Sequence, residues 1–144
     1  LVAGPGLVND WTLEVPAESV LEVTPDRLLP VGVREVAGEL DFRSPRVIGE
    51  TALDHAYTGL TRSSGIASVR VTSPTGTGVE CRFGEACDWV QVHTADRPDP
   101  AENRIGLAVE PMTCPPDAFN SRMDLIRLAP GASHTASWCI SAIG

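Results

Sequence analysis

The 144-residue chain contains no lysine, because its eleven basic residues are all arginines. Without lysine, a chain cannot form a Schiff base through its own side chains and cannot hold a P-loop lysine. The net charge of −8 leaves no basic stripe for phosphates, so we predict no nucleic-acid partner. No apolar run reaches the length of a membrane span, so we predict no membrane partner either.

Cysteine spacing gives no sign of a metal centre. The four cysteines form no C-x-x-C pair and have no histidine at zinc-finger spacing. Scattered thiols in a chain without a signal-like start are more typical of reduced core residues than of a disulfide framework. We predict no metal site and no cofactor, and we expect a cytoplasmic location.

Short alternating segments predict an all-β fold. Apolar side chains recur at every second position of residues 66–72, and a Pro- and Gly-containing turn leads into residues 79–83, which indicates a hairpin. Twelve prolines, thirteen glycines and frequent short strands favour an antiparallel β-sandwich over βαβ repeats. We predict a polar exposed loop at residues 96–104 and no substantial helix. The predicted strands are residues 11–15, 19–24, 66–72, 79–83, 88–94, 105–110, 124–128 and 133–141.

Residues 105–110 end in a carboxylate, Glu110, and are followed by three prolines within six residues. Strand alternation would direct Gly106, Ala108 and Glu110 to one face and the larger apolar side chains to the other. Because Gly106 and Ala108 are small, a ligand could approach the sheet closely beside Glu110. Pro111 has no amide donor and is predicted to end the strand. A fixed acid in this setting suits an active site or a sugar-binding site.

Six segments together resemble the aldose 1-epimerase, or galactose mutarotase-like, family, and they occur in the family's order. The resemblance implies the supersandwich of large antiparallel sheets, with a small-molecule sugar held in an open cleft. The segments are VTPDRLLPVG (23–32), GELDFRSPRVIG (38–49), LDH (53–55), VQVHT (90–94), GLAVEPMTCPPDAF (106–119) and LAPGASHT (128–135).

The resemblance implies a role for three residues. Glu110 stands where the family has its catalytic base, which takes the anomeric hydroxyl proton while an acid protonates the ring oxygen. Asp54 and Gln91 stand where the family binds sugar hydroxyls, a task that suits an ionised carboxylate with two acceptor oxygens. Taken alone, an acid at a strand end is most often an ion-pair or capping residue, and Gln91 would be an exposed sheet residue.

His93 departs from the family pattern, which commonly has tyrosine there. It lies two residues after Gln91 and therefore on the same face of the strand, where it would line the cleft or simply substitute in a tolerant position. His55 is expected to pack or cap, because it points away from Asp54. Trp89 and Trp138 are expected to anchor the core.

The histidine-bearing motif that supplies the general acid in this family is absent from residues 1–144. We therefore expect this chain to be the C-terminal part of a single mutarotase-like domain, whose N-terminal half is absent, and to be inactive alone. Two alternatives stay open. One is a non-catalytic carbohydrate-binding or regulatory protein on the same scaffold. The other is a structural interpretation, in which exposed sheet edges require a partner, either an N-terminal half or a homo-oligomer.

Overall fold

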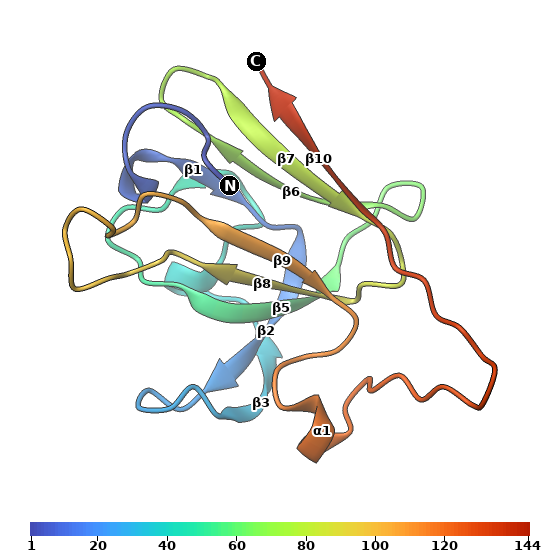
Figure 1. The fold of residues 1–144 in the computed structure, drawn as a ribbon. Coiled ribbons are helices and arrows are strands. Elements are labelled where there is room, and N and C mark those ends of the chain that lie inside the picture. The colour runs from blue at the N-terminus through green and yellow to red at the C-terminus, as the bar shows by residue number, and fades with distance from the viewer.

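The computed structural model describes residues 1–144 as two five-stranded antiparallel sheets packed face to face (Figure 1). The predicted all-β antiparallel sandwich is confirmed. Sheet A has the order β10-β7-β6-β1-β4, with β10 Trp138–Ile143, β7 Gly78–Phe83, β6 Ala67–Thr72, β1 Thr12–Glu14 and β4 Arg46–Val47. Sheet B has the order β3-β2-β5-β8-β9, with β3 Pro30–Glu35, β2 Ala17–Val23, β5 Asp54–Leu60, β8 Trp89–His93 and β9 Ala108–Met112.

Helical structure is confined to three short elements. Two are single 3₁₀ turns, Val8–Asp10 and Gly38–Leu40, and the third is α1, Ala118–Ser121. None of them has the length and apolar character that a helix needs to cross a membrane.

The main core fills the space between the two sheets. It is a cluster of 21 buried residues, to which β6 and β7 contribute from sheet A and β5 and β8 from sheet B. Tyr57 of β5 and Val90 of β8 are fully buried within it. A much smaller cluster of Leu21, Ala56 and Trp89 lies apart from this core. It occupies the outer face of sheet B, because strand alternation directs Ala56 and Trp89 away from Tyr57 and Val90.

The predicted hairpin is confirmed as β6 and β7. Its strands pair over their full length, from Ala67 opposite Phe83 to Thr72 opposite Gly78. Gly76 adopts φ +87° in the connecting turn, a left-handed conformation that glycine takes without a steric penalty. The alternation in β6 follows the prediction, because Ala67, Val69 and Val71 are buried and the residues between them are not.

Three strands were not predicted from the sequence. β3 pairs with β2, β4 pairs with β1, and β5 lies in the centre of sheet B between β2 and β8. Viewed alone, the tetrapeptide Leu53-Asp-His-Ala56, which leads into β5, would pass as a turn or a cap. It is extended here because its backbone bonds come from strands that are distant in sequence.

The prediction that Pro111 ends its strand is wrong. Residue 111 lies within β9, opposite Val90 of β8. β9 is the edge strand of sheet B, and alternate residues of an edge strand direct their amide groups away from the sheet. A proline at such a position removes no ladder hydrogen bond.

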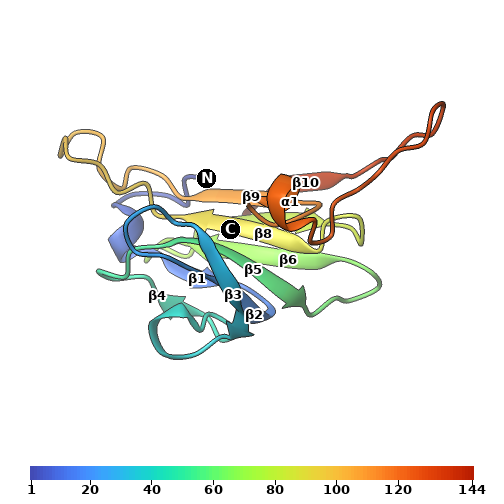
Figure 2. The ribbon, with the colours of Figure 1, turned by 90° about the horizontal axis from the view of Figure 1, so that it is seen from below.

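The C-terminal region also differs from the prediction. Residues 124–128 form no strand, and the last strand begins at Trp138 rather than at residue 133. The connection between β9 and β10 therefore spans residues 113–137, and in both ribbon views much of it extends away from the sheets (Figures 1 and 2). Trp138 is 64% exposed, so the expectation that it anchors the core is wrong.

Candidate functional site

The outer face of sheet B brings together all four site residues predicted from the sequence. Asp54 of β5 lies opposite His93 of β8, and Gln91 of β8 lies opposite Glu110 of β9. Directly opposite residues of an antiparallel pair project from the same face of a sheet. The small cluster with Ala56 lies on this face, so the four polar side chains border an apolar surface.

Gln91 and Asp54 form a hydrogen-bonded pair across β5 and β8. The amide Nε2 of Gln91 donates to Oδ1 of Asp54 at 2.6 Å. The other end of the amide, Oε1, is buried and has no partner within the protein. An unpartnered acceptor of this kind is costly unless a ligand donates to it. Oδ2 of Asp54 also takes no hydrogen bond from the protein, and 40% of the side chain is exposed.

His93 has one nitrogen committed to the protein. Its Nδ1 lies 3.0 Å from the backbone oxygen of Leu53 and 3.8 Å from Oδ2 of Asp54. A carbonyl oxygen only accepts hydrogen bonds, so Nδ1 carries the proton and Nε2 is the free acceptor when the ring is neutral. The predicted placement of His93 on the face of Gln91 is confirmed.

His55 supports Asp54 from the neighbouring position. Its Nδ1 accepts a hydrogen bond of 3.2 Å from the backbone amide of Asp54. Burial lowers the pKa of His55, while the nearby carboxylate of Asp54 acts in the opposite direction. His55 therefore packs against the backbone, as the sequence predicts, and stays on the far side of β5 from the site.

Glu110 projects from the edge strand beside this pair. It is exposed, and it takes part in none of the protein's ion pairs, so no arginine neutralises it. Of the two small residues predicted to leave room beside it, Ala108 lies on the same face, opposite His93. Gly106 has another role. A Cβ atom there would lie 3.3 Å from the backbone oxygen of Leu1, so the chain's own first residue occupies that space.

A pocket of about 190 Å³ lies next to the polar pair. Its walls combine Asp54 and Gln91 with an apolar floor from Leu21 and Ala56, a mixture that is typical of small-molecule sites. Pro116, from the connection after β9, closes one side, and Val23 and Leu28 complete the lining. Glu110 is not a lining residue and stands beside the pocket through its pairing with Gln91.

Trp89 holds the long connection against this face. Its indole Nε1 donates to Oδ2 of Asp124 at 2.8 Å, and its ring is buried in the cluster with Leu21 and Ala56. The expectation that Trp89 is a buried anchor is confirmed, although it anchors the outer face of sheet B rather than the main core.

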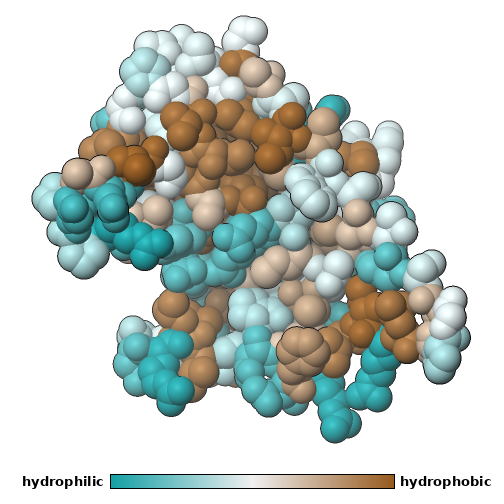
Figure 3. Space-filling model, viewed as in Figure 1, coloured by the Kyte–Doolittle hydropathy of each residue, from teal (hydrophilic) through white to brown (hydrophobic).

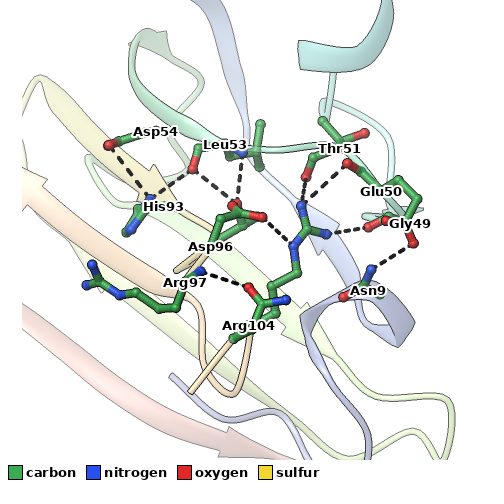
Figure 4. A network of polar contacts seen from close by, with 12 residues as sticks. Asn9, Gly49, Glu50, Thr51, Leu53, Asp54, His93, Asp96, Arg97 and Arg104 are labelled. Atoms are coloured by element: carbon green, nitrogen blue, oxygen red, sulfur yellow. Dashed lines mark hydrogen bonds and ion pairs between the residues drawn. The ribbon is translucent and has the colours of Figure 1, made fainter. Parts of the chain in front are cut away.

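Arg104 is the site-supporting residue that sequence reasoning missed. It lies in the loop predicted to be exposed, yet it is only 4% exposed, and it is the centre of a network of polar contacts (Figure 4). Its guanidinium donates to Oδ1 of Asp96 at 2.6 Å and to the backbone oxygens of Gly49, Glu50 and Thr51. Every residue has a main-chain carbonyl, so residue types cannot show which carbonyls accept hydrogen bonds from an arginine. No sequence pattern therefore predicted that Arg104 is buried.

Thr94 connects this arginine network to the site. Its hydroxyl accepts a hydrogen bond from the backbone amide of Leu53 at 2.9 Å and lies against the carboxylate of Asp96. Burial is the largest influence on the pKa of Asp96 and raises it, but the hydrogen bonds from Thr94 and Arg104 outweigh burial and lower that pKa. Leu53 directly precedes Asp54, so the network fixes the start of β5.

No group of three or more His, Cys, Asp or Glu side chains gathers closely enough to hold a metal ion. The predictions of no metal and no cofactor stay predictions.

Comparison with known proteins places this chain in a family. A family model described as aldose 1-epimerase matches residues 2–141. This chain belongs to the aldose 1-epimerase family. The resemblance of its six motifs to that family is thereby confirmed.

Individual relatives match this chain over part of their own length. An uncharacterised protein of Escherichia coli K12, YihR, is 30% identical over 131 residues, which are 88% of this chain and 39% of the relative. The GalM/aldose epimerase homologue of C. elegans has a TM-score of 0.72 at 21% identity. A putative aldose 1-epimerase of E. coli K12 has a TM-score of 0.69 at 20% identity. The match covers 95% of this chain and 46% of each solved structure, so the chain spans less than half the length of these relatives.

Proposed function

We propose that this chain carries the base and the sugar-binding groups of an aldose 1-epimerase, which interconverts the α and β anomers of a free aldohexose. The observation that carries the proposal is the unpaired carboxylate of Glu110 directly opposite Gln91, which is itself bonded to Asp54. Such an arrangement offers a proton acceptor next to groups that recognise hydroxyls.

The proposed reaction needs no net consumption of protons. Glu110 takes the proton of the anomeric hydroxyl while a general acid protonates the ring oxygen, and the bond between that oxygen and the anomeric carbon breaks. Rotation about the first carbon–carbon bond presents the other face of the aldehyde. Reclosure reverses both proton transfers and gives the other anomer.

The binding roles follow from the polar pair. Asp54 Oδ2 and Gln91 Oε1 are the acceptors that the protein leaves free, and a sugar offers hydroxyl donors for both. The apolar floor of Leu21 and Ala56 suits the carbon-bound hydrogens of a sugar ring. His93 presents Nε2 as a further acceptor at the rim.

The general acid is proposed to come from outside residues 1–144. Neither His93 nor His55 provides a donor beside Glu110, because His93 commits its Nδ1 proton to Leu53 and His55 lies behind β5. We therefore expect residues 1–144 alone to exchange anomers no faster than buffer. A clear catalytic rate from this chain alone would contradict the proposed origin of the acid.

Exchange NMR on α-glucose and α-galactose tests the base. In the protein produced from its complete coding sequence, Glu110→Gln should lower the exchange rate by at least ~100-fold. The matched control is Glu102→Gln, an exposed glutamate of the loop before β9, which should leave the rate unchanged. Unchanged exchange in Glu110→Gln would remove the assignment of the base. Sugar binding without any exchange in the wild-type protein would favour the carbohydrate-binding alternative.

A further inference from the structure

The connection between β9 and β10 leaves sheet B and returns to it at the same place. β9 ends at Met112, which lies opposite Trp89 of β8. Further along the connection, Asp124 accepts the hydrogen bond from the indole of that same tryptophan. Residues 113–123 therefore form a closed loop whose two ends meet at one residue pair of the sheet, as in an Ω-loop.

One hydrogen bond ties this connection to the sheets. Among the hydrogen bonds of residues 113–136, the one between Trp89 and Asp124 alone reaches another part of the chain, and the others lie within the connection. The space-filling view shows the connection as a mixed surface of apolar and polar residues (Figure 3). Its apolar side chains therefore add little packing against the sheets. The exposed ones include Phe119, Met123, Ile126 and Leu128.

The backbone of the connection needs such a tie. Asp117, Arg122 and Asp124 have φ values of +62°, +63° and +50°, in the left-handed region. Residues with a Cβ atom adopt this region at an energetic cost, and they keep it only where the surroundings hold them. The first two lie at the two ends of α1 and turn the chain back toward Trp89. The third carries the carboxylate that meets it.

The tie joins the floor of the pocket to one of its walls. Trp89 packs with Leu21 and Ala56, and these two residues form the floor. Pro116 lies inside the closed loop and forms a wall. Asp124 does not line the pocket itself. It can therefore act on a bound ligand only through the position of the loop.

We propose that Asp124 is a positioning residue, which accepts the indole proton of Trp89 and thereby keeps Pro116 at the wall of the pocket. Without this bond the closed loop moves away from sheet B and the pocket widens. The affinity for sugar then falls, while the proton transfers at Glu110 continue unchanged. The effect on sugar rests on the proposed function, whereas the position of the wall can be measured without any sugar.

Two substitutions of Asp124 separate its side chain from its backbone. Asp124→Gly removes the acceptor, and glycine adopts the left-handed conformation without a steric penalty. Asp124→Asn keeps an acceptor oxygen in a residue that also tolerates this conformation. Phe119→Ala is the matched control, because this side chain of the same connection is 89% exposed and leaves the bond to Trp89 in place.

Trypsin measures the hold on the connection in the protein produced from its complete coding sequence. Trypsin cuts after arginine, and the connection carries the exposed Arg122 and Arg127. Asp124→Gly should raise the cleavage rate at these two sites at least ~5-fold, as expected for one lost hydrogen bond. Asp124→Asn and Phe119→Ala should cleave like the wild type. Cleavage after Arg70 in β6 reports global unfolding and should stay constant.

Removing the donor should have the same effect as removing the acceptor. Trp89→Phe keeps an aromatic ring in the cluster but offers no indole proton. Combined with Asp124→Gly, it should accelerate cleavage no further than either substitution alone, because the two residues share one interaction. This result would also show that the flexibility of glycine does not cause the effect.

Anomer exchange kinetics measure the consequence for the sugar. Asp124→Gly should raise KM at least ~5-fold and leave kcat within about twofold, because it removes binding without touching a reacting group. Asp124→Asn should restore the wild-type KM. The methyl resonances of Leu21 and Ala56 should shift in the glycine variant and return in the asparagine variant, with no sugar present.

Three outcomes would overturn the proposal. Unchanged cleavage in Asp124→Gly would show that the bond does not hold the connection. Faster cleavage with an unchanged KM would show that the connection does not shape the sugar site. If the wild-type protein exchanges no anomers, the proposed function fails, and the methyl resonances decide this inference alone. Resonances that stay in place in Asp124→Gly would then overturn it, and shifted resonances would support it.

Discussion

The side-chain amide of Gln91 donates its hydrogen bond to Asp54 across two strands, at 2.6 Å, and leaves its oxygen buried without a partner. This one contact orients both side chains. It holds the carboxylate toward the pocket and determines that the amide presents an acceptor, rather than a donor, at the other end.

We predict that Gln91→Met weakens the proposed sugar-binding site. Methionine has a similar length but offers no hydrogen bond, so the specificity constant for anomer exchange should fall by about tenfold, which corresponds to one lost hydrogen bond. Steady-state exchange kinetics of the protein from its complete coding sequence measure this change. Thr58→Val serves as the control, because it removes a different side-chain hydrogen bond of β5, to the backbone of Asp88. Equal losses in both variants would show that Gln91 acts only through folding.

The protonation state of His93 gives a second prediction, and it can be checked on this chain alone. The carbonyl of Leu53 requires the proton on Nδ1. Long-range proton–nitrogen NMR of the neutral ring should show Nδ1 protonated and Nε2 free. Observation of the opposite tautomer would rule out Nε2 as an acceptor for the sugar.

Arg104 is predicted to be a major contributor to stability. Arg104→Met would leave Asp96 and three backbone oxygens without their donor, at a cost of about 3 kcal/mol in the free energy of unfolding. Urea unfolding measures it. Arg97→Met, in the same loop, removes an exposed arginine that forms no ion pair and should cost less than about 0.5 kcal/mol. If the two variants unfold at similar urea concentrations, the network does not stabilise the fold.

Asp96 should contribute to the pH dependence of the free energy of unfolding. Its pKa is lower in the folded chain than its ordinary value, so the unfolded chain binds protons more readily as the pH falls. The contribution of Asp96 is therefore complete above about pH 5 and is lost as the pH falls through the folded pKa. Asp96→Asn should flatten the curve of unfolding free energy between about pH 5 and pH 3. Asp99→Asn, an exposed carboxylate of the same loop, is the control, and an equal flattening there would contradict the assignment.

Sequence reasoning succeeded where a property was local. Alternation in residues 66–72 predicted β6 and its buried face, and the same rule placed Gln91 and His93 together, away from Val90. The resemblance to a family implied a sugar-binding role for Asp54, which the structure places on the same face, although its strand, β5, was not predicted.

The failures all depend on neighbours that are distant in sequence. Pro111 is tolerated because β9 is an edge strand, which is a property of the whole sheet. Arg104 is buried against backbone acceptors that lie 53 to 55 residues earlier in the chain. Trp138 is exposed because no element of the chain covers the inner face of β10. No local pattern contains this information.

The connection of residues 113–137 joins the pocket on the outer face of sheet B to β10, the edge strand of sheet A. It forms a wall of the pocket at Pro116, is hydrogen-bonded to Trp89 at Asp124, and leads directly into β10. Because one stretch of peptide both lines the pocket and leads into β10, we expect a displacement of β10 to change the shape of the pocket. A ligand that fills the pocket would favour one position of β10 by the same free energy with which that position favours the ligand.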